Sequence, residues 1–348
     1  MPVELIRRCD ELGYHVVWTA EAYGSDALSP LAYLAAVTDR IKLGTAVVQI
    51  AARTPAATAM HAMTIDALAG GNRTIIGLGV SGPQIVEGWY GRPWGKPNAM
   101  LRDYVAIMRK VLRREAPVEH DGSQISLPYT GPGSIGQGKP LKSILHPNPG
   151  IEIWLASGAP LNTALCAEVA DGWLPMGYGP DGAEVHGPAL EKGFAKRDPR
   201  EKPRDQFEIF TNISVEITDD VQAVLDRQRP LRAMYVGGMG SSSHNYHRDA
   251  MARAGFADEA DRIQELFLAG RKEEAIAAMP DEYLEQGALY GSVDRIRRRF
   301  EGAVPAGATG VTIRTAQPEA VELMAELAGT RDQPRPNQTR PNLAEENQ

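Results

Sequence analysis

Apolar and polar positions along the chain follow two alternating patterns. Short runs rich in Val, Ile and Trp, bounded by Gly, Pro or Asp, are typical of buried strands, and between them Ala and Leu recur at helical spacing. The runs predict strands at 15–19, 41–48, 74–80, 151–156, 172–176, 207–217 and 310–314. The helical patterns occupy 3–12, 31–39, 56–69, 98–114, 161–170 and 318–327. This alternation predicts an α/β fold, with βαβ units around a parallel sheet.

Seven strands are one fewer than the eight that close a barrel. The chain opens on a helix that ends at Gly13 and is followed by a strand, so we expect the first of eight strands to be absent from this chain. Three segments interrupt the alternation: the Gly- and Pro-rich 116–150, the mostly helical 219–290 and the polar 330–348. We expect the first two to be insertions over a site and the last to be a disordered tail, so that 1–329 form one domain.

Composition and charge narrow the class of protein. The 348 residues, 43% of them hydrophobic, are enough for one large core. A net charge of -7 argues against a general nucleic-acid or membrane-surface binder, because such a protein has to neutralise phosphates. We therefore expect a small-molecule partner. The two cysteines form no framework or motif, and no signal peptide or apolar run of about 18 residues occurs, so we expect a cytoplasmic protein.

Residues 73–84 join an apolar strand to a turn rich in Gly and Ser and then to the start of a helix. Alternating glycines let the backbone approach a flat ligand, because no Cβ stands in the way. Read alone, the segment fits a ligand-binding turn and a plain tight turn equally well. It lacks the third glycine and the later acidic residue of a Rossmann site, so we do not expect a nicotinamide cofactor bound in such a site. No metal-binding motif occurs either, and we expect no metal site.

A second turn of interest follows the strand at 151–156. Ala156, Ser157 and Gly158 lead into a helix, with Pro160 near its first position, where the missing N–H is not needed. The backbone N–H groups of such a turn can hold a phosphate at the positive end of the helix dipole. The alternative is that Ser157 only caps the helix.

Six short motifs occur in the order seen in luciferase-like oxidoreductases and extend over nearly the whole chain. They are Trp18-Thr19-Ala20-Glu21, Leu43-Gly44-Thr45-Ala46-Val47, Arg53-Thr54-Pro55, Gly77 to Gly82 with Glu87-Gly88-Trp89, Ala156-Ser157-Gly158 and Ala170-Asp171-Gly172-Trp173. The chain resembles most closely the branch that depends on the deazaflavin coenzyme F420, which includes methylenetetrahydromethanopterin reductase. The resemblance implies a homodimer of (β/α)8 TIM barrels, with the cofactor at the carboxyl ends of the strands.

The resemblance also implies which residues hold the cofactor. Ala46 and Val47 match the end of a strand where the family commonly has a bulge, with a non-prolyl cis peptide packed against the deazaflavin ring. The other residues expected at the ring are Gly79, Val80, Ser81 and Gly82. The turn at 156–158 matches the phosphate-binding turn of the family.

Glu21 is the first candidate for a catalytic residue. It follows a strand, at a place where the family has an acidic residue near the edge of the ring, and could orient the ring, hold a substrate or transfer a proton. The weaker, substrate-side candidates are Tyr23, Asp26, Gln84 and Glu87. Ala22 stands where the sugar-phosphate dehydrogenases of this branch carry a histidine base, so we do not expect oxidation of glucose 6-phosphate.

The leading hypothesis is an oxidoreductase that moves hydride between the deazaflavin and a small organic substrate. One alternative is an FMN-dependent luciferase-like monooxygenase, whose ring and phosphate sites would look alike. The two differ in the anionic tail of the deazaflavin, which Arg53, Lys139 or Lys142 would meet. Another alternative is a degenerate flavin-binding barrel without turnover, because an open barrel would expose two sheet edges.

Overall fold

The computed structural model describes residues 1–239 and 245–330. The chain divides into two compact units, and each is described by itself. The first unit comprises Met1–Met176, His186–Ile209 and Gly329–Gln348, and the second comprises Gly177–Val185 and Phe210–Ala328. Most of the predicted disordered tail, residues 331–348, lies outside the described residues.

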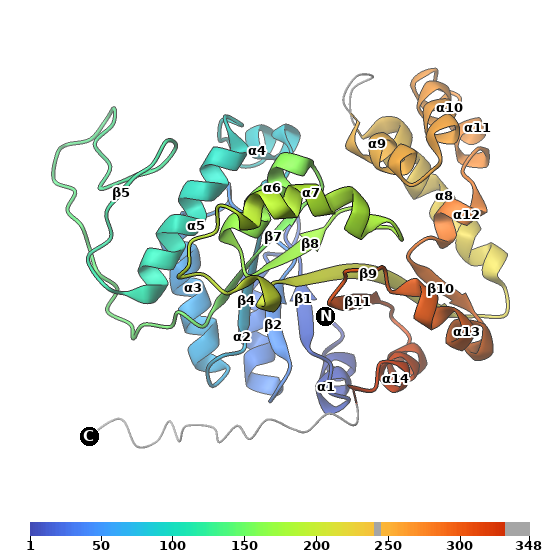
Figure 1. Ribbon diagram of the computed structural model, residues 1–348, viewed down its shortest axis with the longest axis horizontal. Helices are drawn as coiled ribbons and strands as arrows, with labels where there is room; N and C mark the ends of the chain where they lie inside the picture. The colour runs from blue at the N-terminus through green and yellow to red at the C-terminus, as the bar shows by residue number, and fades with distance from the viewer. Residues whose placement is uncertain (240–244, 331–348) are drawn as a thin grey trace. The chain divides into compact units, whose positions relative to one another are not determined.

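The first unit alternates strands and helices (Figure 1). Its strands are β1 (Val16–Thr19), β2 (Lys42–Thr45), β3 (Val48–Gln49), β4 (Thr74–Gly79), β5 (His120–Asp121), β6 (Ser126–Leu127), β7 (Glu152–Ser157) and β8 (Gly172–Pro175). Its helices are α1 (Val3–Glu11), α2 (Leu28–Val37), α3 (Pro55–Leu68), α4 (Pro83–Gly88), α5 (Pro97–Arg113), α6 (Pro160–Val169) and the short η1 (Arg204–Gln206). Helix α7 (Gly182–Phe194) and strand β9 (Glu208–Ile217) each begin in one unit and end in the other.

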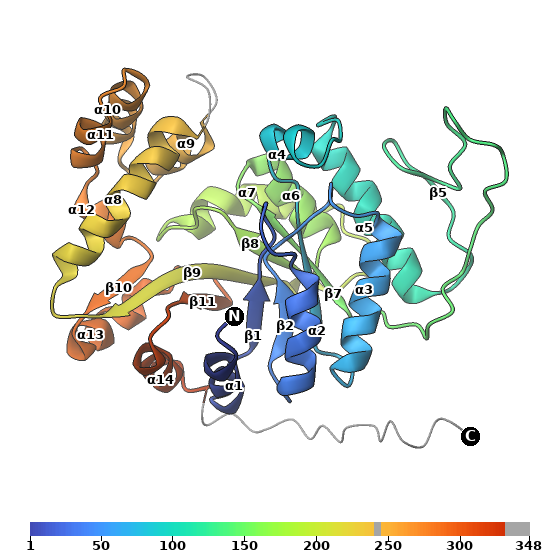
Figure 2. The same ribbon diagram turned by 180° about the vertical axis from the view of Figure 1, so that it is seen from behind.

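Most strands of this unit form a parallel sheet in the order β1-β2-β4-β7-β8-β9, and β3 pairs with the carboxyl end of β4. Strands β5 and β6 pair antiparallel in a separate two-stranded sheet. Helices α2, α3, α5 and α6 pack on one another in chain order, and α2 and α3 lie side by side in Figure 2. With β10 added after β9, seven parallel strands follow one hydrogen-bonded path. The predicted α/β fold with a parallel sheet is confirmed, whereas closure into an eight-stranded barrel stays a prediction.

Two indole side chains cover glycines on one face of this sheet. Trp18 pairs in register with Gly44, and Trp154 pairs in register with Gly172. A Cβ atom on either glycine would lie 2.3 to 2.4 Å from the ring of its tryptophan. The two indole rings lie 5.4 Å apart. Glycine is therefore required at both positions, because any side chain would displace an indole from this face.

The second unit is mostly helical. Its helices are α8 (Val221–Gly238), α9 (Tyr246–Arg253), α10 (Ala257–Leu268), α11 (Lys272–Ala277), α12 (Asp281–Glu285), α13 (Val293–Ala303) and α14 (Pro318–Leu327). Strands β10 (Ala288–Gly291) and β11 (Gly310–Arg314) both pair in parallel with β9. One hydrophobic cluster joins α8 to α10 and α12, and another joins β9 to α13 and α14. The second unit thus has apolar cores of its own.

All seven predicted strands and all six predicted helices occur, with ends shifted by a few residues. The predicted strand at 41–48 is divided into β2 and β3. Strands β5, β6 and β10 were not predicted. The first two lie in the Gly- and Pro-rich segment 116–150, and three of the four residues of β10 fall within 219–290, which was expected to be mostly helical. Among the described residues no strand precedes α1. None of the helices in the described part of the chain is long and apolar enough to cross a membrane.

Candidate functional site

The break between β2 and β3 is a backbone bulge at the carboxyl edge of the sheet. The peptide bond between Ala46 and Val47 is cis, as the resemblance implies. The amide of Ala46 donates to the carbonyl of Thr19 (2.6 Å), and the carbonyl of Val47 accepts from the amide of Glu21 (3.3 Å). These two bonds tie the bulge to the end of β1. They bring the predicted cofactor residues Ala46 and Val47 beside the predicted catalytic residue Glu21.

The glycines of β4 have a different role from the one the sequence indicates. A Cβ on Gly77 would lie 2.0 Å from the carbonyl oxygen of Thr45, and one on Gly79 would lie 2.5 Å from the side chain of Val47. Both glycines therefore make room for the neighbouring bulge, and the contact of Gly79 with the deazaflavin ring stays a prediction. The turn that follows keeps its predicted place at the carboxyl edge: Ser81 has a positive φ of 61°, and Gly82 precedes α4.

Glu21 is buried and ion-paired. Its side chain is 5% exposed, and Nη1 of Arg53 lies 2.7 and 2.8 Å from its two oxygens. The amide of Gln49 donates to Oε2 of Glu21 at 3.1 Å. Arg53, predicted to meet an anionic tail, is thus engaged by Glu21 in the described structure. Lys139 and Lys142, the other predicted partners of the tail, are exposed in the segment 116–150.

Gln49 is a residue of this site that the sequence analysis missed. Its Nε2 donates to the backbone carbonyl of Glu21 at 3.0 Å. Its Oε1 is buried and accepts no hydrogen bond, although the residue is only 7% exposed. Buried polar atoms in folded proteins are nearly always hydrogen-bonded, so this oxygen is available to accept a hydrogen bond from a ligand. A polar residue directly after the apolar run of 41–48 is the sequence signal that could have identified it.

Two tyrosines flank the ion pair of Glu21 and Arg53. The hydroxyl of Tyr104 donates to the carbonyl of Arg53 at 3.2 Å and contacts the hydroxyl of Thr58 at 2.5 Å. Burial raises the pKa of Tyr104 to about 12. Burial, followed by the negative charge of Glu21, also raises the pKa of Tyr90 above its ordinary value. Both phenols are therefore neutral near pH 7.

The turn after β7 is only partly as predicted. The hydroxyl of Ser157 contacts Sγ of Cys166 at 3.2 Å and accepts from Nε1 of Trp173 at 2.9 Å, so its side chain serves the buried interior. Helix α6 follows with Ala159 as its N-cap and no side-chain cap. The backbone N–H groups of its first turn are therefore the groups that can bind a phosphate here. Ala156 and Gly158 belong to the same turn and contribute backbone only.

The substrate-side candidates lie in loops and on α4, and none of them forms a hydrogen bond or ion pair with Glu21 in the described part of the chain. Tyr23 is 68% exposed, with its ring 6.5 Å from that of Trp89. Asp26 caps α2 by accepting from the amides of Leu28 and Ser29, both at 2.8 Å, and lies 3.9 Å from Arg53.

The other two candidates lie on α4. Glu87 accepts from the amide of Trp94 at 3.2 Å, and Gln84 is exposed. The carboxylates of Asp26 and Glu87 therefore already accept hydrogen bonds from backbone amides, whereas the side chains of Tyr23 and Gln84 are exposed to solvent.

A cavity of about 590 Å³ opens beside the ion pair. The loop 50–56, Val80 at the end of β4, the loop 92–97, α5 and the residues Ile125 and Leu127 enclose it. Its volume falls in the range of sites for drug-sized ligands. Because Val80 and Arg53 line it, the cavity adjoins both the predicted cofactor residues and the ion pair of Glu21.

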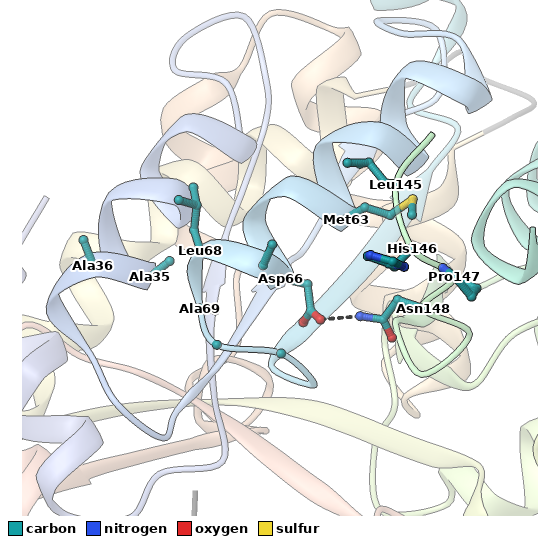
Figure 3. A pocket seen from close by; sticks show the side chains of 13 residues that line it. Ala35, Ala36, Met63, Asp66, Leu68, Ala69, Leu145, His146, Pro147 and Asn148 are labelled. Carbon is teal, nitrogen blue, oxygen red and sulfur yellow. Dashed lines mark hydrogen bonds between the residues drawn. The ribbon is translucent and has the colours of Figure 1, made fainter. Parts of the chain in front are cut away.

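A second cavity, of about 430 Å³, lies at the opposite edge of the sheet (Figure 3). Asp66 at its wall accepts from the amides of Asn72, Arg73 and Thr74 and from the side chain of Asn148. Thr74 begins β4, so these bonds fix the amino end of that strand. The carboxylate is saturated by the protein's own donors. No cluster of potential metal ligands occurs among the described residues.

Comparisons with known proteins identify similar chains. A family model described as luciferase-like monooxygenase matches residues 2–310. A Mycobacterium tuberculosis protein, provisionally named a coenzyme F420-dependent oxidoreductase, is 44% identical over 325 residues, which cover 93% of each chain.

Two solved structures share the fold. The coenzyme F420-dependent tetrahydromethanopterin reductase of Methanopyrus kandleri has a TM-score of 0.71 at 22% identity, with 93% of both chains covered. An F420-dependent secondary alcohol dehydrogenase, in complex with an F420-acetone adduct, has a TM-score of 0.69 at 14% identity, with 94% of both covered. At these identities the two structures are evidence for the fold alone.

Proposed function

Because the chain belongs to the luciferase-like monooxygenase family, we propose that it is a coenzyme F420-dependent oxidoreductase. It transfers hydride between the deazaflavin and a small organic substrate. The observation that carries the proposal is the unpaired, buried Oε1 of Gln49 beside the cis bulge of Ala46 and Val47. The name of the relative at 44% identity supports the deazaflavin over other cofactors.

The residues at the carboxyl edge fit a flat, hydrogen-bonding ring. Ala46, Val47 and Val80 offer apolar surface that is partly open, and Gln49 offers an acceptor. The first turn of α6 offers N–H groups for a phosphate. When bound, the deazaflavin supplies a ring carbon that accepts or gives up a hydride.

Glu21 and Arg53 act as positioning residues in this proposal. The ion pair fixes the loop after β1, and Glu21 binds both the backbone and the side chain of Gln49 through its carboxylate and its carbonyl. The acceptor of Gln49 is thereby held in one orientation. A site whose polar groups are oriented before the ligand arrives loses less entropy when it binds. Direct proton transfer by Glu21, one of the roles expected from the sequence, would require Arg53 to release the carboxylate.

The alternatives are an FMN-dependent monooxygenase and a barrel that binds a flavin without turnover. Parallel fluorescence titrations of the purified protein with coenzyme F420 and with FMN distinguish all three. Binding of the deazaflavin at micromolar or lower concentration, with much weaker binding of FMN, is the expected result. Selective binding of FMN would favour the monooxygenase, and binding of neither would leave the barrel without a cofactor.

A further inference from the structure

The cavity of about 590 Å³ beside Arg53 has an unusual distribution of charge. Its walls are mostly apolar and include Ile50, Val86, Trp94, Met100 and Leu127. The charged residues that line it are two arginines, Arg53 and Arg92, and no acidic residue lines it. An apolar cavity with a few polar groups of one sign is typical of a ligand site.

The two arginines differ in availability. Arg53 is held by Glu21 at 2.7 Å. The guanidinium of Arg92 has no hydrogen-bond or ion-pair partner among the described residues, and the residue is exposed and lines the cavity. Its backbone is fixed nonetheless, because its amide donates to the carbonyl of Val86 at 3.0 Å. A cation with a fixed backbone and no protein partner is available to a ligand.

The inner end of the cavity offers no competing charge. The hydroxyl of Tyr104 is occupied by Thr58 and the carbonyl of Arg53. Burial raises the pKa of Tyr104 to about 12, so the phenol stays neutral and does not repel an anion. Val80, next to the glycine turn, links the cavity to the predicted ring site.

We propose that this cavity is the substrate site and that the substrate is an organic acid, with its apolar body between Trp94, Met100 and Leu127 and its anionic head at Arg92. The inference rests on the proposed function only in placing the substrate beside the ring at Val80. It deepens that function by assigning a class of substrate. Guanidinium groups bind carboxylates and sulfonates through charge-assisted hydrogen bonds.

The test uses two fluorescent probes that share an apolar body and differ in charge. They are 8-anilinonaphthalene-1-sulfonate, which is anionic, and N-phenyl-1-naphthylamine, which is neutral. We expect wild-type protein to prefer the sulfonate, and Arg92→Gln to bind it about fivefold more weakly, as suits an exposed ion pair. Binding of the neutral probe should not change.

Two further variants locate the probes. Lys96→Gln removes an exposed cation from the same loop that does not line the cavity, and it should bind both probes as wild-type protein does. Ile125→Trp fills the cavity and should weaken both probes, with thermal melting as the check on folding. The inference would be overturned if Arg92→Gln and Lys96→Gln lost the same affinity for the sulfonate. It would also be overturned if Ile125→Trp bound both probes as wild-type protein does.

Repeating the titration with saturating coenzyme F420 separates the inference from the proposed function. Retained binding of the sulfonate to the loaded protein supports a separate substrate site. Displacement of the sulfonate by the deazaflavin would assign the cavity to the cofactor and overturn the inference, while the proposed function stands. If the deazaflavin does not bind but the dependence on Arg92 remains, the proposed function fails and the anion site is kept.

Discussion

Glu21 and Arg53 form the buried ion pair around which the candidate site is organised, with side chains 5% and 19% exposed. Removing one partner of such a pair leaves an uncompensated buried charge. The two single substitutions should therefore together lower the stability more than the double substitution does. A double-mutant cycle of Glu21→Gln and Arg53→Gln should give a coupling of about 2 kcal/mol in the free energy of unfolding.

The matched control for this cycle is the exposed pair of Asp198 and Arg200, 2.8 Å apart, whose side chains are 43% and 64% exposed. Exposed pairs contribute little to stability, so the coupling of this pair should be far smaller than that of Glu21 and Arg53. Equal couplings for the two pairs would mean that the Glu21 pair is effectively solvated.

Gly77 tests the role assigned to the glycines of β4. A methyl group at this position would lie 2.0 Å from the carbonyl oxygen of Thr45, which belongs to backbone and cannot move aside easily. Gly77→Ala should therefore lower the free energy of unfolding by about 3 kcal/mol. Gly88→Ala is the control, because an added Cβ there would meet nothing within 4 Å. Chemical denaturation measures both, and a small effect of Gly77→Ala would contradict the packing role.

At the scale of elements, β2 and β7 are joined by a buried ionic contact at their amino ends. Glu152 lies 3.1 Å from Nζ of Lys202 and also contacts Nζ of Lys42. Burial acts to raise the pKa of Glu152, but the two ammonium groups outweigh it and lower the pKa to about 2. The folded state therefore holds the carboxylate ionised well below its ordinary pKa of 4.5.

A carboxylate with a lowered pKa stabilises the fold above its unfolded pKa, and this stability is lost as the pH falls towards the folded value. At pH 7 the free energy of unfolding of the wild-type protein should thus be about 3 kcal/mol higher than that of Glu152→Gln. The difference should shrink as the pH falls from about 4.5 towards 2. Denaturation at a series of pH values measures it, with the exposed Glu191→Gln as control. A difference that does not depend on pH would refute the ionic origin.

The elements themselves were largely predictable, and the site was less so. Apolar runs and helical spacing are local signals, and they located β1, β4 and α3 to within a few residues. The resemblance implied the cis bulge at Ala46. The roles of Gly77 and Ser157 could not be predicted, because each is decided by a contact with another strand or helix, distant in the chain. Gln49 was missed because its partners become visible only in three dimensions.

At the scale of the whole molecule, we propose that the protein is a homodimer, as the resemblance implies. Tyr33 on α2 and Met60 and Leu68 on α3 are each more than half exposed, which favours a partner surface over these helices. Light scattering after size exclusion should give twice the 37.7 kDa of one chain. Met60→Glu should shift the mass towards the monomer, and the exposed Met176→Glu should not. A monomeric wild-type protein would refute the dimer.

The central claim is that the carboxyl edge of the sheet, with the cis bulge and Gln49, holds the deazaflavin. The most direct test compares the affinity of coenzyme F420 for Gln49→Leu with that for wild-type protein and for Gln84→Leu, the same change at an exposed position on α4. Loss of a buried acceptor should weaken binding about tenfold in Gln49→Leu, while Gln84→Leu binds as wild-type protein does. Equal affinities for all three proteins would place the cofactor elsewhere and contradict the account.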